Sequence, residues 1–133
     1  MKLALVALPL LLSACAQYPQ HGYAAGPDQQ RLAADLAVRV PGPSQPCISS
    51  FDQRGLHVVG HDIVYDAGRT IFVNHTGGGC EAGGSTGYTL VFDHFGGTNS
   101  ELCRGTIVKV VDLTSGMFGG SCALGDFIPF NPR

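Results

Sequence analysis

The chain has 133 residues, of which 14% are charged, and its formal net charge at pH 7 is −2. A chain of this length forms one domain at most, and its composition is that of a globular protein rather than a multispan membrane protein. Because there is no excess of positive charge to attract phosphates, we expect no nucleic acid partner.

The first residues predict a bacterial lipoprotein signal peptide. Residues 1–14 read MKLALVALPLLLSA, which is a lysine followed by an apolar run and a small pair. The run is shorter than the ~20 residues that a transmembrane helix needs, so it indicates a secretory leader. The tetrapeptide LSAC at 12–15 resembles the lipobox of bacterial lipoproteins, in which the cysteine is acylated and the leader is cut before it. We therefore predict lipidation of Cys15; the alternative is an ordinary leader cut elsewhere, with Cys15 discarded or free.

The residues after Cys15 indicate the compartment. In lipoproteins of double-membraned bacteria, an aspartate at this place tends to retain the product in the inner membrane, and here the neighbours are Ala16 and Gln17. The resemblance thus implies the inner leaflet of the outer membrane, with the domain facing the periplasm. Two or three acyl chains suffice for such anchoring. The expected partners are the membrane, through the lipid on Cys15, and an envelope protein or the cell wall.

Residues 15–45 contain recurring prolines and predict a flexible linker. Within it, Leu32 and Leu36 are spaced as on one face of a helix, so we expect a short helix over 28–38 with Asp28 as its cap.

Four cysteines remain for the domain at 46–133: Cys47, Cys80, Cys103 and Cys122. An even number of cysteines in a short exported domain predicts two disulfides. Four cysteines allow three connectivities, of which we favour Cys47 with Cys122, joining the ends of the domain, and Cys80 with Cys103. A structural zinc site is the alternative, but the close C-x-x-C pairs typical of such sites are missing from the sequence.

Six segments of the domain are rich in β-branched and aromatic residues and are separated by turn residues, which predicts strands. They are residues 57–60, 62–65, 69–75, 87–95, 105–113 and 126–130. We therefore expect an all-β fold, a small antiparallel sandwich or partly open barrel of five to six short strands, stapled by two disulfides.

The cysteine frame also resembles an uncharacterised family of small bacterial envelope proteins, many of which carry a lipobox. The resemblance starts at Cys47 and includes GGC at 78–80, LCRG at 102–105 and GSCALGDF at 120–127. It implies the same fold and compartment. It implies no activity and no catalytic residue.

Two motifs in the glycine-rich segment 77–87 match signatures of catalysis or cofactor binding. GGSTG at 83–87 matches the nucleophile elbow G-x-S-x-G, with Ser85 as the nucleophile, but a strand-like segment follows it where a helix is required. GGGCEA at 77–82 matches a dinucleotide fingerprint without its βαβ frame. We interpret both as loop sequence around a half-cystine, and we expect no cofactor.

Histidines and aspartates give the remaining candidates. His57 and His61 are too far apart along one strand to bind one ion, unless Gly60 breaks the strand. His75 and His94 end their strands and could meet across a hairpin beside Asp93. Aspartates at strand ends are typical of turns. These are Asp62, Asp66, Asp93, Asp112 and Asp126.

These observations favour a lipid-anchored, periplasm-facing binding or structural module that is not an enzyme and holds no metal. The competing hypothesis is a small envelope enzyme or metal-binding protein that uses Ser85 or the region of His75 and His94.

Overall fold

Short runs of β-branched and aromatic residues form most of the strands, and glycine-rich turns separate them. The computed structural model describes residues 26–93 and 101–133, so Cys15 and His94 lie outside the described part of the chain. In chain order the elements are α1 (Pro27–Ala37), β1 (Arg39–Pro41), β2 (Cys47–Ile48), η1 (Ser50–Asp52), β3 (Leu56–Val59), β4 (Asp62–Asp66), β5 (Ile71–His75), η2 (Glu81–Gly84), β6 (Tyr88–Asp93), β7 (Leu102–Cys103), β8 (Ile107–Asp112), β9 (Phe118–Ala123) and β10 (Phe127–Pro132).

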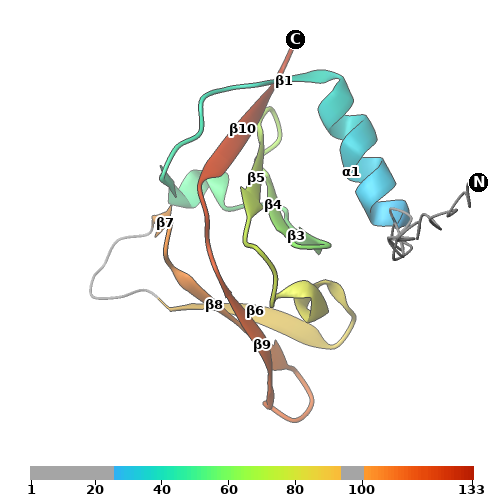
Figure 1. Ribbon diagram of the computed structural model, residues 1–133, viewed down its shortest axis with the longest axis vertical. Coiled ribbons are helices and arrows are strands. Elements are labelled where there is room, and N and C mark those ends of the chain that lie inside the picture. Colours follow the sequence, from blue (N-terminus) through green and yellow to red (C-terminus); the bar gives the residue numbers. More distant parts are fainter. Residues whose placement is uncertain (1–25, 94–100) are drawn as a thin grey trace, which may run out of the picture.

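The strands form three antiparallel sheets (Figure 1). The largest has the order β1-β10-β5-β4-β3, the second has the order β6-β8-β9, and β2 pairs with β7 in a short ladder. The sheets do not join into a closed barrel. The prediction of an antiparallel all-β fold is confirmed, although the expected five to six strands were too few.

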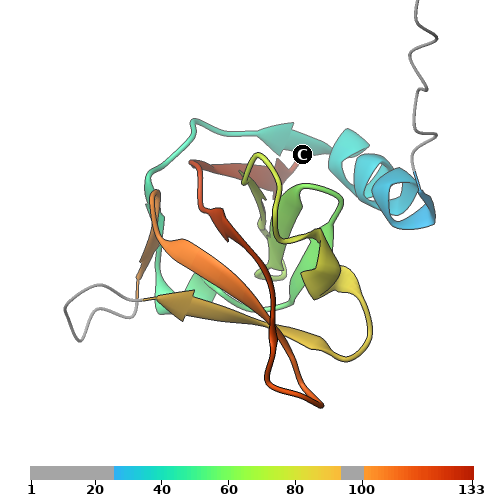
Figure 2. The same ribbon diagram turned by 60° about the horizontal axis from the view of Figure 1, so that its bottom comes forward.

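The main core lies between the two larger sheets, as Figure 2 shows from below. Ile63 and Tyr65 of β4 point into it from one side, and Val108 and Val110 of β8 point into it from the other. The ring of Tyr65 lies 5.9 Å from that of Phe127. The Tyr65 hydroxyl has no hydrogen-bond partner among the described residues, and burial raises the pKa of its phenol.

A second, smaller core covers the opposite face of the five-stranded sheet. Successive side chains of a strand point to opposite faces, so Val64 lies on the face that Ile63 and Tyr65 do not use. Leu32 and Leu36 of α1 pack against this face. Both faces of β4 and β5 are therefore buried, which explains why 63–65 of β4 and 71–73 of β5 are apolar without alternation.

The predicted helix is present, but it begins at Pro27, with Gly26 rather than Asp28 at the N-cap position. The Gly26 N–H donates to the side chain of Gln29 at 3.0 Å. After the helix, β1 pairs with β10, and Gln45 forms a bridge to Phe127. Within the predicted linker, residues 26–45 thus form a helix and a strand that contact the rest of the described domain. None of the described helices is long and apolar enough to cross a bilayer.

The two disulfides join Cys47 to Cys103 and Cys80 to Cys122. The prediction that all four cysteines are oxidised in pairs is confirmed, but the favoured pairing of Cys47 with Cys122 and Cys80 with Cys103 is wrong. Cys47 and Cys103 are directly opposite each other in the β2-β7 ladder. The ends of the domain, which a disulfide was expected to join, are held by the β1-β10 pairing instead.

Candidate functional site

The glycine-rich loop between β5 and η2 is shaped by close backbone contact with β9. Gly77, Gly78 and Gly79 all have positive φ, a conformation that other residues adopt at a cost. A side chain at Gly79 would lie only 2.1 Å from the carbonyl oxygen of Ser121. The next residue, Cys80, is bonded to β9 through its disulfide. The glycines of this loop thus allow a tight backbone contact, and the interpretation of GGGCEA as a loop around a half-cystine is confirmed.

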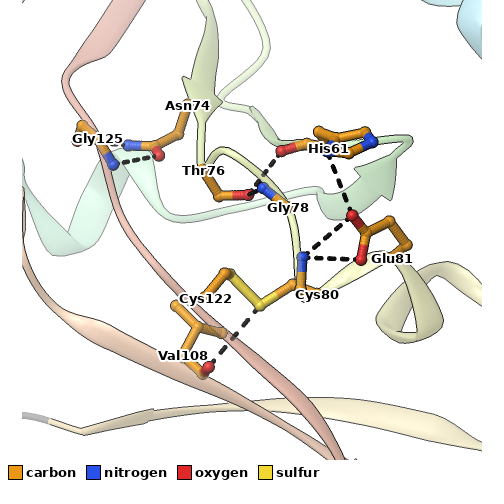
Figure 3. Close-up of a disulfide and its surroundings, with 10 residues drawn as sticks. His61, Asn74, Thr76, Gly78, Cys80, Glu81, Val108, Cys122 and Gly125 are labelled. Carbon is orange, nitrogen blue, oxygen red and sulfur yellow. Dashed lines mark hydrogen bonds and ion pairs between the residues drawn. A yellow bond between two sulfur atoms is a disulfide. The ribbon is translucent and has the colours of Figure 1, made fainter.

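Polar groups gather beside the buried disulfide, as Figure 3 shows. Glu81 accepts hydrogen bonds from the Gly79 N–H at 3.0 and 2.9 Å, and its carboxylate lies 3.3 Å from Nδ1 of His61. The Thr76 hydroxyl donates to the His61 carbonyl at 2.7 Å and accepts from the Gly78 N–H at 3.2 Å. The backbone N–H of Glu81 itself is the main cause that holds the pKa of the Glu81 carboxyl below its usual value. Desolvation opposes it, and the Gly79 N–H and His61 add smaller lowering effects.

Asn74 is the one fully buried polar side chain among the described residues. Its amide donates to the Gly125 carbonyl at 2.8 Å and accepts from the Gly125 N–H at 2.9 Å (Figure 3). These two bonds satisfy backbone groups where the chain turns into β10. Because both ends of the amide are occupied, Asn74 has a structural role.

The predicted site at His75 and His94 stays a prediction, because only His75 and its surroundings are described. His75 lies opposite Asp62 in the β4-β5 register, and its Nδ1 is 2.5 Å from the carboxylate. β5 and β6 belong to different sheets, so their ends are not partners in a hairpin, and Asp93 pairs instead with Lys109 at 2.7 Å. His94 lies outside the described residues.

His57 and His61 contact different groups. His57 lies in β3, whereas Gly60, with φ of 61°, ends that strand before His61. Both imidazoles are exposed, and His57 contacts the Gly55 carbonyl at 2.9 Å.

Within residues 26–93 and 101–133, donor atoms suited to a metal lie close together at Cys47, Glu101 and Cys103. The two sulfurs are bonded to each other, and a disulfide offers no thiolate to zinc. The remaining cysteines are also paired. The zinc alternative is therefore excluded for the oxidised protein.

Ser85 ends η2 and is exposed. β6 follows it, so it does not occupy the strand-to-helix turn of a nucleophile elbow. The aspartates at strand ends bind turn N–H groups or cations, as expected for such positions. The pairs, apart from Asp62 with His75, are Asp66 with Gly68, Asp112 with Thr114, Asp93 with Lys109 and Asp126 with Arg104.

A groove of about 480 Å³ lies between α1, β3 and η2. Its floor is the whole of β3, from Leu56 to Val59, and its two walls are one side of α1 and the residues Gly83 and Gly84. The helix contributes its charged residues. These are Asp28, Arg31 and Asp35.

Sequence reasoning missed this groove. β3 is the last strand of its sheet, so one side of its backbone has no strand partner. η2 covers part of that side, since a side chain at Gly84 would lie 2.9 Å from the Val58 carbonyl oxygen, whereas Leu56 and His57 stay exposed. Which strand lies at an edge depends on topology and has no signature in the residues of β3.

Comparisons of the chain with models of protein families, with curated proteins and with solved structures found no match. The resemblance of the cysteine frame to a family of envelope proteins therefore stays a prediction.

Proposed function

We propose that this protein is a bacterial lipoprotein, held to the outer membrane by acyl chains on Cys15, whose periplasm-facing domain binds a short peptide segment of an envelope partner. It is a binding module and not an enzyme. The observation that carries the proposal is the groove between α1 and the edge strand β3.

The covalent chemistry supports the compartment. Disulfides form and persist in oxidising spaces such as the periplasm, and both cysteine pairs of the domain are oxidised. A lipid anchor at Cys15 would leave the protein surface free for binding, because acyl chains alone hold a domain to a bilayer.

The groove supports the kind of partner. An extended peptide can hydrogen-bond to the free side of an edge strand, and side chains of the groove then supply specificity. In the β3-β4 ladder the backbone of Gly55, His57 and Val59 faces β4, whereas that of Leu56 and Val58 faces away from it. η2 covers the Val58 carbonyl, so the exposed Leu56 offers this backbone. Arg31 and Asp35 stand on the facing wall, and both are exposed. A volume of about 480 Å³ falls within the range of binding pockets for small molecules and short peptides.

Site-specific photocrosslinking in intact envelopes tests the proposal. A photoreactive amino acid at His57 should capture a partner, whereas the same group at Phe51, which is 81% exposed and lies outside the groove, should not. Arg31→Glu should abolish capture from position 57. Ala33→Glu, on an exposed position of the same helix outside the groove, is the matched control and should leave it intact.

Equal capture from positions 57 and 51, or equal effects of the two substitutions, would refute the groove as the binding site. The rival hypothesis is separated by Ser85→Ala and His75→Ala. Both variants should capture the partner as the parent protein does.

A further inference from the structure

The turn between β8 and β9 carries an exposed apolar tip, which we define as Leu113, Met117 and Phe118. These side chains are 66%, 70% and 63% exposed. Figures 1 and 2 both show that the β8–β9 hairpin projects from the body of the domain. Large apolar side chains gathered at one exposed place indicate an interaction surface.

Several N–H groups of this turn are hydrogen-bonded within it. Asp112 Oδ1 accepts the N–H groups of Thr114 and Ser115 at 2.8 and 2.9 Å, and the Asp112 carbonyl accepts the Gly116 N–H at 2.8 Å. The N–H groups of Ser115 and then Thr114 lower the pKa of the Asp112 carboxyl. A turn whose backbone groups are already hydrogen-bonded loses less when it leaves water than an open loop does.

The tip carries no charge of its own. Residues 113–118 read LTSGMF, without a lysine, arginine or carboxylate. Attraction to anionic headgroups therefore contributes little here, and transfer of apolar surface out of water is the driving force.

The length of the chain before the domain is compatible with contact between the tip and a bilayer. The eleven residues from 16 to 26 span at most about 40 Å. A domain of this size is roughly 35 Å across by the scaling of compact chains. Acyl chains on Cys15 thus keep every face of the domain within reach of the membrane surface.

We propose that the apolar tip inserts into the leaflet that holds the acyl chains of Cys15, so that the domain is attached at two points and its orientation is fixed. This inference rests on the proposed lipid anchor. A second copy of the chain is a weaker candidate, because a stable dimer buries about 800 Å² per partner and three side chains on a narrow hairpin supply far less.

The chain contains no tryptophan, so a single substitution places a unique fluorophore at the tip. We would compare Met117→Trp with Phe51→Trp, an exposed apolar position in η1, outside the tip. Each full-length lipidated variant is reconstituted in phosphatidylcholine vesicles with or without brominated acyl chains.

The tryptophan at position 117 should be blue-shifted on reconstitution and quenched by brominated lipid at least about threefold more strongly than that at position 51, because tryptophan settles at the headgroup level. The quenching should not increase with the anionic lipid content, since residues 113–118 hold no cation and the nearest charge in the turn is the Asp112 carboxylate.

Equal quenching at the two positions, in protein that floats with the vesicles, would overturn insertion of the tip while the lipid anchor stands. Crosslinking between two tips without quenching would overturn it in favour of a second copy. Protein that does not float with the vesicles would overturn both the anchor and the inference drawn from it.

Discussion

The two disulfides close loops of similar length but differ in burial, which separates two sources of stability. Their sequence separations are 56 residues for Cys47–Cys103 and 42 for Cys80–Cys122. Loop closure is worth about 4 kcal/mol for either, and its logarithmic dependence on length makes Cys47–Cys103 the stronger by only about 0.3 kcal/mol. By loop length alone, removing either bond should cost nearly the same.

Burial reverses this order. Cys80 and Cys122 are 2% and 7% exposed and belong to the main core, where Cys80 Sγ lies 3.7 Å from the Val108 carbonyl oxygen. Cys47 and Cys103 are half-buried. Replacing both cysteines of the buried pair by alanine leaves two voids of sulfur size, at roughly 1 kcal/mol each. The double variant Cys80→Ala/Cys122→Ala should therefore lose about 2 kcal/mol more than Cys47→Ala/Cys103→Ala.

Urea unfolding of the two double variants, extrapolated to zero denaturant, measures this difference directly. Each variant retains one disulfide, so each serves as the control for the other. An equal loss, or a larger loss for the Cys47→Ala/Cys103→Ala variant, would show that packing around the buried bond does not set its contribution.

Three further changes test the loop and its surroundings by the same assay. Asn74→Ala should cost about 2–4 kcal/mol, because the part-buried N–H and carbonyl of Gly125 lose their partners and a fully buried side chain is removed. A loss under about 1 kcal/mol would mean that these groups find other partners. Gly79→Ala should unfold the protein or cost more than about 3 kcal/mol, since its methyl group would overlap β9. The control Gly77→Ala has free space around the added methyl group and should cost about 1–2 kcal/mol for its positive φ. Equal losses in the two variants would contradict the backbone contact. Glu81→Gln should lower stability at pH 7. Because the folded-state pKa of Glu81 is depressed, the difference from the parent protein should disappear as the pH falls through that pKa, below the ordinary value of 4.5. A difference in stability that persists at pH 2 would contradict a contribution from the charge.

The strands that could be predicted are those whose own residues favour a pleated, half-buried surface. Each of the six predicted segments overlaps an observed strand, and the segment 105–113 contains the whole of β8. The strands that were missed contain few such residues. β2 and β7 have two residues each, and β9 begins with Phe-Gly-Gly. They are strands because a neighbouring segment pairs with them, which depends on tertiary structure.

The same limit applies to the candidate site. An even number of cysteines predicts two bonds, but the partner of Cys47 is set by its register against Cys103. The groove depends on β3 being an edge strand and on α1 lying beside it, and neither fact is local. The apolar tip, in contrast, is visible in the sequence as Leu113, Met117 and Phe118 around a turn, although only the structure shows that they are exposed.

The central claim is that one cysteine carries lipid while the other four are oxidised in an envelope compartment. Intact mass spectrometry of the protein extracted from its native membranes, after alkylation without reductant, measures both states at once. We predict a chain that begins at an acylated Cys15 and takes up no alkyl group at Cys47, Cys80, Cys103 or Cys122. A bare Cys15, or alkylation of the four domain cysteines, would contradict the proposal.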